Sequence, residues 1–220
     1  MHPLDRPVWA ALSGRQRQFA IGDGRALRLD PEIGLFAAAA EGEADSLAAL
    51  VPEGAVIGLV ETELPSLPVT LRIVKQAPCV QMVAERLAPP PDLAFEALGD
   101  DDAPDMLELA TLTEPGPFFA RTHQLGAFIG IRREGRLVAM AGERMKPPGF
   151  TEVSGVCTRP GWRGRGYAAG LMATVAARIA ARGDTPFLHA YADHAATIAL
   201  YERLGFRVRT RVVYALVARV

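Results

Sequence analysis

The clearest pattern of hydrophobic and polar positions lies in the second half of the chain. Leu171, Val175 and Ile179 recur every four residues and predict an amphipathic helix over residues 166–181. The other elements predicted there are, in chain order, a helix over 100–112, a hairpin over 128–133 and 136–140, strands over 150–158 and 187–191, a helix over 195–204, and two short strands within 206–217. This mixture of helices and strands predicts a mixed α/β domain.

The first half of the chain has a weaker pattern. It predicts a short helix over 5–12, a helix that ends near 51, and strands over 55–60, 69–74 and 80–84. Three consecutive prolines at 89–91 can neither continue a helix nor lie inside a sheet. We therefore predict a smaller α/β domain over residues 1–88, which is not the catalytic one, a linker over 89–92, and the main domain over 93–220.

The composition indicates a globular protein. Half of the 220 residues are hydrophobic and 22% are charged, which is enough apolar material for a buried core. The net charge of −1 argues against a protein built mainly to bind nucleic acid. No apolar stretch reaches the roughly 18 residues that cross a bilayer, and the N-terminus lacks the layout of a signal peptide. We expect a cytoplasmic protein with neither a nucleic-acid nor a membrane partner.

The cysteines and histidines do not predict a metal site. Cys79 and Cys157 are too few for a disulfide scaffold or for a zinc site made of cysteine pairs. His189 and His194 lack the carboxylate-rich or cysteine-rich spacing of metal ligands.

Charge is unevenly distributed along the chain. Of the 24 basic residues only two are lysine, which is typical of a genome-wide arginine bias. Residues 1–98 carry 8 basic and 13 acidic side chains, and residues 99–220 carry 16 and 12. From Arg159 onward the count is 10 basic against 3 acidic, a local charge of +7. A basic last third in a nearly neutral protein indicates an anion site there.

The segment from Val156 to Ala168 has the features of such an anion site. It places a strand, then a turn rich in glycine and arginine, then the beginning of the long helix. The first N–H groups of a helix have no internal partner and carry partial positive charge. Gly164 and Gly166 leave room for an oxygen to approach the backbone, and Arg163 and Arg165 add charged donors. A pyrophosphate fits this description.

Three other interpretations of the segment compete with that one. A Walker loop requires a lysine and a hydroxyl residue, and neither is correctly placed here. A dinucleotide fingerprint requires Gly-x-Gly-x-x-Gly, whereas Gly164, Gly166 and Gly170 form Gly-x-Gly-x-x-x-Gly, with one additional residue before the last glycine. The third interpretation is a plain turn with solvated arginines. If the Gly-Arg-Gly stretch were the only signal, this interpretation would be favoured.

Two motifs together resemble one known family. Arg163-Gly-Arg-Gly-Tyr-Ala168 fits Arg/Gln-x-x-Gly-x-Gly/Ala, the phosphate-loop pattern of the GNAT superfamily of acyltransferases. About 30 residues later, Leu200-Tyr-Glu-Arg-Leu-Gly-Phe206 resembles the end of that superfamily's last core helix. The resemblance covers about residues 93–220 and implies a GNAT fold there. It is closest to members that carry an additional N-terminal half, a degenerate copy of the same fold.

The resemblance implies that acetyl-CoA is the co-substrate. In the family, the strand before the phosphate loop separates from its neighbour, and its free backbone groups hold the pantetheine arm. A family asparagine that also bonds this arm corresponds to His194 here, which is a departure from the pattern. The residues expected to bind acetyl-CoA are Val156, Cys157, Thr158, Arg163, Gly164, Arg165, Gly166, Tyr167, Ala168 and His194.

The resemblance also implies two catalytic residues. Tyr201 matches the tyrosine that lies near the cofactor sulfur, where a phenol can protonate the departing thiolate; the alternative is a tyrosine of the hydrophobic core. Glu152 is the candidate general base, and we expect partial burial to raise the pKa of its carboxyl; the alternative is a solvated carboxylate at the strand edge. Glu143 is the second candidate for the base.

The predicted function is transfer of an acetyl group from acetyl-CoA to a primary amine of a small molecule, such as an amino acid. In the family, the region after the first helix borders the acceptor. Glu114 is therefore a candidate for attracting the amine, and Arg121 for pairing with a carboxylate. The alternative function is a CoA-binding or sensory module without turnover, which the His194 departure and the motif-free first half leave open.

Overall fold

The computed structural model describes residues 2–220. Its helices are α1 (Pro7–Leu12), α2 (Ala103–Thr113), α3 (Tyr167–Ala181) and α4 (Ala195–Arg203), with short 3-10 turns at Arg17–Phe19, Ala44–Leu50, Asp100–Asp102, Thr122–Leu125 and Pro160–Trp162. Its strands are β1 (Ala20–Gly22), β2 (Ala26–Leu29), β3 (Ala37–Ala39), β4 (Val56–Glu61), β5 (Leu71–Ala84), β6 (Glu96–Leu98), β7 (Phe128–Arg133), β8 (Arg136–Glu143), β9 (Phe150–Thr158), β10 (Thr185–Tyr191) and β11 (Phe206–Arg219). The predicted mixed α/β class is confirmed.

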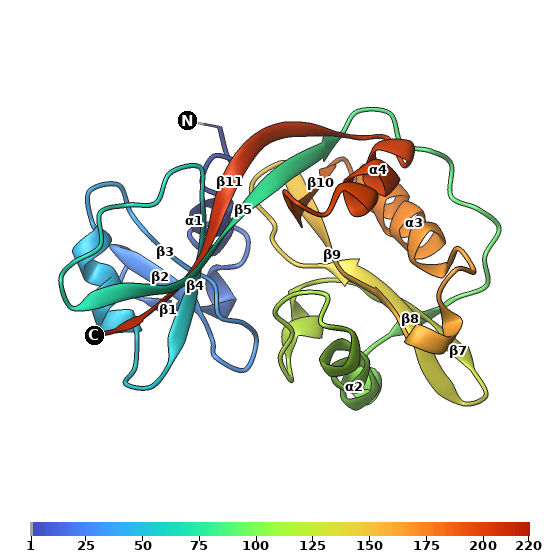
Figure 1. The fold of residues 1–220 in the computed structure, drawn as a ribbon, viewed down its shortest axis with the longest axis horizontal. Helices are drawn as coiled ribbons and strands as arrows, with labels where there is room; N and C mark the ends of the chain where they lie inside the picture. The colour runs from blue at the N-terminus through green and yellow to red at the C-terminus, as the bar shows by residue number, and fades with distance from the viewer. Residues whose placement is uncertain (1) are drawn as a thin grey trace.

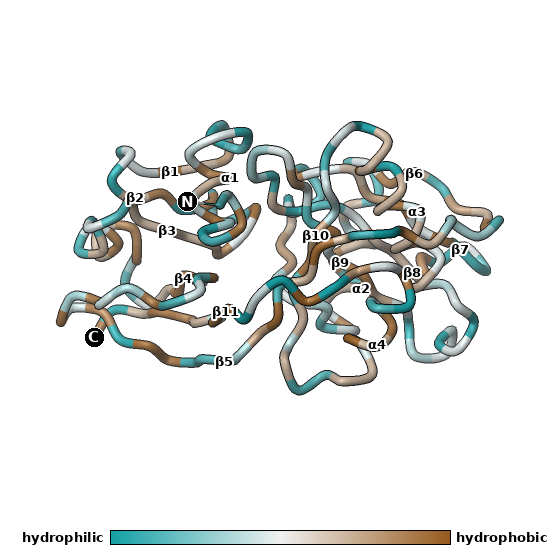
Figure 2. The backbone as a smooth tube through the Cα atoms, turned by 90° about the horizontal axis from the view of Figure 1, so that it is seen from above, coloured by the Kyte–Doolittle hydropathy of each residue, from teal (hydrophilic) through white to brown (hydrophobic). Residues whose placement is uncertain are grey.

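The strands described here form a small sheet, β1-β2-β3, and an eight-stranded sheet in the order β4-β11-β5-β10-β9-β8-β7-β6. Within the large sheet only β9 and β10 are parallel neighbours. Figure 1 shows two lobes joined by the long strands β5 and β11. We call the part with α1 and β1–β4 the N-terminal lobe and the part with β6–β10 and α2–α4 the C-terminal lobe; Figure 2 shows them side by side from above.

The two long strands differ from the sequence prediction. Residues 206–217, predicted as two strands, belong to the single strand β11, which is interrupted by a register shift between Val208 and Thr210 rather than by a turn. The strands predicted over 69–74 and 80–84 are likewise one strand, β5. Pro78 lies within β5 just beyond the last β5–β10 pair. Its carbonyl oxygen accepts a hydrogen bond from Ala192 N, just past the end of β10, so the N–H that proline lacks is missing only where the ladder with β10 ends.

The sheet crosses the predicted domain boundary. Residues 89–92 lie between β5 and β6, so β5 precedes the boundary, yet β5 pairs with β10 on one side and with β11 on the other. Strand β11 in turn pairs with β4 of the N-terminal lobe. The division into residues 1–88 and 93–220 therefore describes the order of the chain, while the hydrogen-bonded sheet is continuous.

Helix α3 covers the C-terminal lobe as its pattern predicts. Leu171, Val175 and Ile179 are all buried and pack in one cluster with residues of β7 and β8, such as Ile129 and Val138. Burial of each such side chain contributes roughly 1.5–3 kcal/mol. This packing fixes the helix beneath the sheet and places its N-terminal end beside the end of β9.

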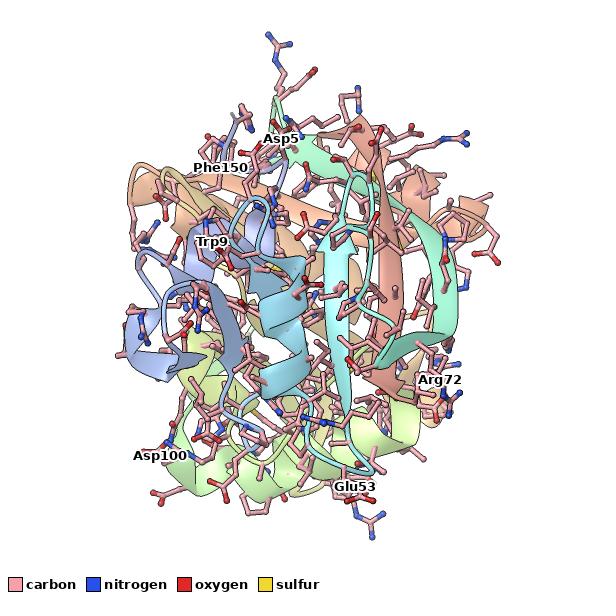
Figure 3. The ribbon with its side chains drawn as sticks, turned by 90° about the vertical axis from the view of Figure 1, so that its left-hand side faces the viewer. Asp5, Trp9, Glu53, Arg72, Asp100 and Phe150 are labelled. Atoms are coloured by element: carbon pink, nitrogen blue, oxygen red, sulfur yellow. The ribbon has the colours of Figure 1, made fainter. Side chains whose placement is uncertain are left out.

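The two lobes share a second hydrophobic cluster. Leu12 of α1 and Phe36 of the N-terminal lobe pack with Phe187 of β10. The first residues also contact the C-terminal lobe, because the His2 ring lies 5.3 Å from the Phe150 ring at the start of β9. Figure 3 shows Phe150 near Asp5, at the end of the molecule where the chain begins. Among residues 2–220 there is no helix long and apolar enough to cross a membrane.

Candidate functional site

Strands β9 and β10 separate part of the way along their length. Their parallel pairs are confined to Phe150–Glu152 and Thr185–Phe187. Beyond Glu152, β9 continues to pair with β8, with a register shift near Gly155, whose φ of 63° lies in the left-handed region. The backbone of β9 that follows is therefore turned toward a gap in the sheet rather than toward β10. This is the separation that the family resemblance predicted.

A cleft of about 450 Å³ lies at the end of β9. Its wall includes the predicted positions Val156, Cys157 and Thr158 together with residues 162–169. Burial raises the pKa of the Cys157 thiol to about 11, so this side chain stays protonated and packs in the wall. Every residue predicted to bind the cofactor, except His194, thus lines one cavity.

The glycine-arginine turn presents its backbone to this cleft. Gly164 and Gly166 have φ values of 77° and 76°, and no atom lies within 4 Å of the positions that their Cβ atoms would take. Gly166 is the N-cap of α3, and no side chain caps the helix there. The first N–H groups of α3 are therefore available to an anion.

The arginines of the turn are held by local contacts. The Arg165 guanidinium lies 4.7 Å from the centre of the Trp162 ring. The Nε of Arg163 donates a hydrogen bond of 3.2 Å to the carbonyl oxygen of Thr158, at the end of β9. Both arginines are exposed, so their positive charge is available at the rim of the cleft.

A second pocket, of about 230 Å³, adjoins the cleft. The two cavities share four wall residues: Pro115, Val156, Thr197 and Tyr201. Phe36, Val60 and Cys79 line the second pocket from the first half of the chain, and Tyr191 and Tyr214 line it from the second half. We call this cavity the acceptor pocket, because Glu114, one of the two residues predicted to contact the acceptor, lines it.

Tyr201 lies where the two cavities meet. It is carried by α4, and its ring packs against the cluster that holds α3. Burial raises the pKa of its phenol, so the hydroxyl is protonated at neutral pH. The structure thus places Tyr201 in the wall of both the cleft and the acceptor pocket, and its role as the acid stays a prediction.

Glu152 is the predicted site residue whose surroundings differ most from expectation. Its carboxylate accepts two hydrogen bonds from Arg144, at 2.8 and 2.9 Å, and one from His189 Nδ1 at 2.8 Å. It is 1% exposed and lines neither cavity. The expectation that burial raises its pKa is wrong: burial alone acts in that direction, but the charge and hydrogen bonds of Arg144 and His189 outweigh it and lower the pKa to about 2. A carboxylate so placed is a weak base.

Glu143, the second candidate for the base, is also engaged elsewhere. Its side chain is buried and forms ion pairs with Lys146, at 3.0 Å, and with Arg182. It lines neither cavity. Both glutamates are therefore engaged in ion pairs and do not face either cavity.

The two predicted acceptor residues have different positions. Glu114 lines the acceptor pocket and is exposed; it ends α2 in a left-handed conformation with φ of 49°. Arg121 lies outside both cavities and pairs with Glu32 of the N-terminal lobe at 3.1 Å. The structure therefore does not bring Arg121 to the site, because a carboxylate of the chain itself occupies it.

His194 is placed on the acceptor side. It precedes α4, lines the acceptor pocket, and its ring lies 5.2 Å from that of Tyr191. Its side chain is 56% exposed. It does not line the cleft where the cofactor residues gather, so its predicted contact with the pantetheine arm stays a prediction.

Sequence reasoning missed Arg144. Its guanidinium lines the acceptor pocket, pairs with Glu152 and lies 4.8 Å from the centre of the Phe36 ring. One signal was available in the sequence. A hairpin turning at Pro147-Pro-Gly149 places residue 144 opposite residue 152, as the bond from Arg144 N to the Glu152 carbonyl shows. The aromatic wall supplied by Phe36 had no such signal, because it depends on how the lobes meet.

Comparison with known proteins agrees with this architecture. The family model of FR47-like proteins matches residues 128–215. A protein of the GNAT acetyltransferase family from Novosphingobium aromaticivorans is 47% identical over 100% of both chains, with a TM-score of 0.95. Among curated proteins no match is found.

Two more distant structures share the fold. A GCN5-related N-acetyltransferase from Kribbella flavida is 21% identical, covers 96% of this chain and 95% of its own, and has a TM-score of 0.61. An N-acetyltransferase-like protein from Streptococcus suis is 17% identical, covers 96% and 92%, and has a TM-score of 0.56. The full-length match at 47% identity, together with the two motifs and the separated strands, shows that the chain belongs to the GNAT family of acetyltransferases.

Proposed function

We propose that the protein transfers an acetyl group from acetyl-CoA to the primary amine of a small molecule. The observation that carries the proposal is the junction of the two cavities, since Val156 and Tyr201 lie in the wall of both. A donor held in the cleft and an amine held in the acceptor pocket meet at this point. Such alignment of two reactants supplies a large part of the rate.

The cleft fits the phosphates of CoA. Because Gly164 and Gly166 have no Cβ, the space beside their backbone is open to a phosphate. The uncapped start of α3 supplies N–H donors to it. Arg163 and Arg165 add charge at the rim. The backbone of β9 beyond the separation offers its free groups to the pantetheine arm.

The reaction transfers the acetyl group in one direct step. The neutral amine nitrogen forms a bond to the acetyl carbon, the carbon–sulfur bond breaks, and the amine loses one proton. Tyr201 gives a proton to the departing sulfur, and its raised pKa keeps that proton available at neutral pH. The products are the N-acetylated amine and free CoA thiol.

Glu114 is the residue that we assign to the incoming amine. Among residues 2–220 it is the one carboxylate in the wall of the acceptor pocket. It attracts the ammonium form at the open mouth of the pocket, where the proton can leave to water. Glu152 instead holds Arg144 and His189 in place by its hydrogen bonds.

Release of free thiol from acetyl-CoA tests the proposal. Purified protein is given acetyl-CoA and a panel of amines and amino acids, and thiol formation is followed over time. The proposal expects amine-dependent release with at least one acceptor. Tight acetyl-CoA binding without thiol release across the panel would instead indicate the CoA-binding module.

A pair of variants tests the cleft separately. Gly166→Val places a side chain where we expect phosphate, and should weaken acetyl-CoA binding at least tenfold, about 1.4 kcal/mol. Gly183→Val is the matched control, because Gly183 also has positive φ, 87°, and open space around it, but lies at the other end of α3. Equal affinity of two folded variants would contradict the assignment of the phosphate loop.

A further inference from the structure

The Arg144 guanidinium has one nitrogen left over for a ligand. Its Nε and Nη2 donate to the two oxygens of Glu152 at 2.8 and 2.9 Å. This pairing, with the Phe36 ring 4.8 Å away, fixes the plane of the group. The remaining nitrogen, Nη1, lies beside Gly116, which also lines the acceptor pocket, 3.9 Å from where a Cβ of that glycine would be. Two N–H donors on Nη1 are thus held in a fixed direction.

The inner wall of the acceptor pocket has further donors near Arg144. Tyr191 and Tyr214 both line the pocket. Burial raises the pKa of both phenols, that of Tyr214 to about 12, so both hydroxyls are protonated and can donate. The carboxylate in the pocket wall, Glu114, is exposed at the mouth. The pocket therefore presents cationic and neutral donors inside and a negative charge outside.

The rest of the wall is apolar. Phe36, Val60 and Cys79 come from the first half of the chain, and burial keeps the Cys79 thiol protonated by raising its pKa to about 11. A volume of about 230 Å³ is below the roughly 300–1,000 Å³ of pockets for drug-sized ligands. The occupant is therefore a small molecule with an apolar portion.

We propose that Arg144 binds a carboxylate of the acceptor through Nη1, so that the acceptor is a free amino acid with an apolar side chain. The inference rests on the proposed function for the transfer itself. In this arrangement the acceptor carboxylate lies against Arg144, its side chain lies against the apolar wall, and its amine lies toward Glu114 and Tyr201. Arg144 is a substrate-binding residue here, held in position by Glu152.

Matched acceptors test the proposal in the unmodified protein. Leucine, methionine and phenylalanine are each compared with the corresponding amide and with the decarboxylated amine. We expect kcat/KM for the free amino acids to exceed that of both counterparts about 10- to 100-fold, the value of a charge-assisted hydrogen bond. Amides or decarboxylated amines that serve equally well or better would overturn the proposal and leave the acetyl transfer itself standing.

A pair of variants assigns the preference to one residue. Arg144→Lys keeps the charge beside Glu152 but lacks the third, oriented nitrogen. It should reduce the advantage of the free amino acids over the amides and decarboxylated amines to below about threefold. Unchanged affinity for acetyl-CoA shows that the variant is folded. Arg121→Lys, the same change outside both cavities, should leave the preference intact. An unchanged preference in Arg144→Lys would refute the role.

Product binding separates this inference from the proposed function. If no acceptor causes release of the CoA thiol, the proposed acetyl transfer fails, but calorimetry on the CoA-loaded wild-type protein still tests whether the acceptor pocket binds a carboxylate. N-acetylleucine should then bind at least tenfold more tightly than N-acetylleucinamide. Equal binding of the two, or binding of neither, would overturn the carboxylate site. This measurement also replaces the variant if Arg144→Lys does not fold.

Discussion

The buried ion pair between Glu152 and Arg144 gives a quantitative prediction about stability. Replacing Glu152 by glutamine removes the negative charge of a residue that is only 1% exposed, and it leaves Arg144 in the same place without its counter-charge. Glutamine has nearly the same size, so the change is electrostatic rather than one of packing. The affected quantity is the free energy of unfolding.

The expected loss follows from the pKa of Glu152. That pKa falls from an ordinary 4.5 to about 2 in the folded protein. Since one pKa unit corresponds to about 1.4 kcal/mol, the ionised carboxylate contributes roughly 3 kcal/mol at pH 7. Removal of one partner of a buried ion pair generally costs about 3–5 kcal/mol. We therefore expect Glu152→Gln to be destabilised by about 3 kcal/mol at pH 7.

The pH dependence has a definite sign. A carboxyl with a lowered folded pKa binds fewer protons in the folded than in the unfolded protein, so its contribution is complete above about pH 4.5. The contribution is lost as the pH falls from there toward 2. The difference between wild type and Glu152→Gln should therefore shrink over that range.

Urea unfolding at several pH values measures both effects. Glu114→Gln is the matched control, because Glu114 is exposed, and its change in stability should stay within about 0.5 kcal/mol. If Glu152→Gln is as stable as wild type at pH 7, or if the gap between them does not narrow in acid, the ion pair does not stabilise the fold as argued.

Three further predictions concern the site and the sheet. Tyr201→Phe should lower kcat about a hundredfold with little change in acetyl-CoA affinity, because a general acid contributes at least a factor of that size to the rate. Thiol-release kinetics measure kcat, and an unchanged kcat would refute the role of Tyr201 as the acid. Glu114→Gln should lower kcat/KM for amine acceptors about threefold to tenfold in the same assay, without changing stability; an equal kcat/KM contradicts the role. Residues 93–220 expressed alone should not form a folded monomer, because they lack β5, which lies between β10 and β11 in the sheet. A cooperative unfolding transition of this fragment would refute the prediction.

Local sequence patterns predicted the C-terminal lobe well. The strand over 150–158 has the same bounds as β9, and the helix over 166–181 differs from α3 by one residue. These elements are encoded by their own periodicity and by glycines at their ends. The glycine-arginine turn before α3 was also located, since it consists of residues that are adjacent in the chain, while its binding of phosphate stays a prediction.

The features that were not predicted depend on contacts between distant parts of the chain. The strand β5 was divided in two because Pro78 interrupts its pattern, and only the place where β10 ends makes that proline acceptable. The pKa of Glu152 was predicted in the wrong direction because Arg144, which determines it, was not recognised as its neighbour. The short strands β1, β2 and β3, with 3, 4 and 3 residues, are too brief to show a period.

The continuity of the sheet has a consequence for how the enzyme can be altered. Because β5 and β11 belong to both lobes, neither lobe can be exchanged with that of a relative at the proline linker without also exchanging a central strand. By contrast, Phe36 and Val60 form a wall of the acceptor pocket but do not line the cleft. Under the proposed function, substrate range can therefore be redesigned by substitutions in the first half of the chain, while the residues of the cleft are kept.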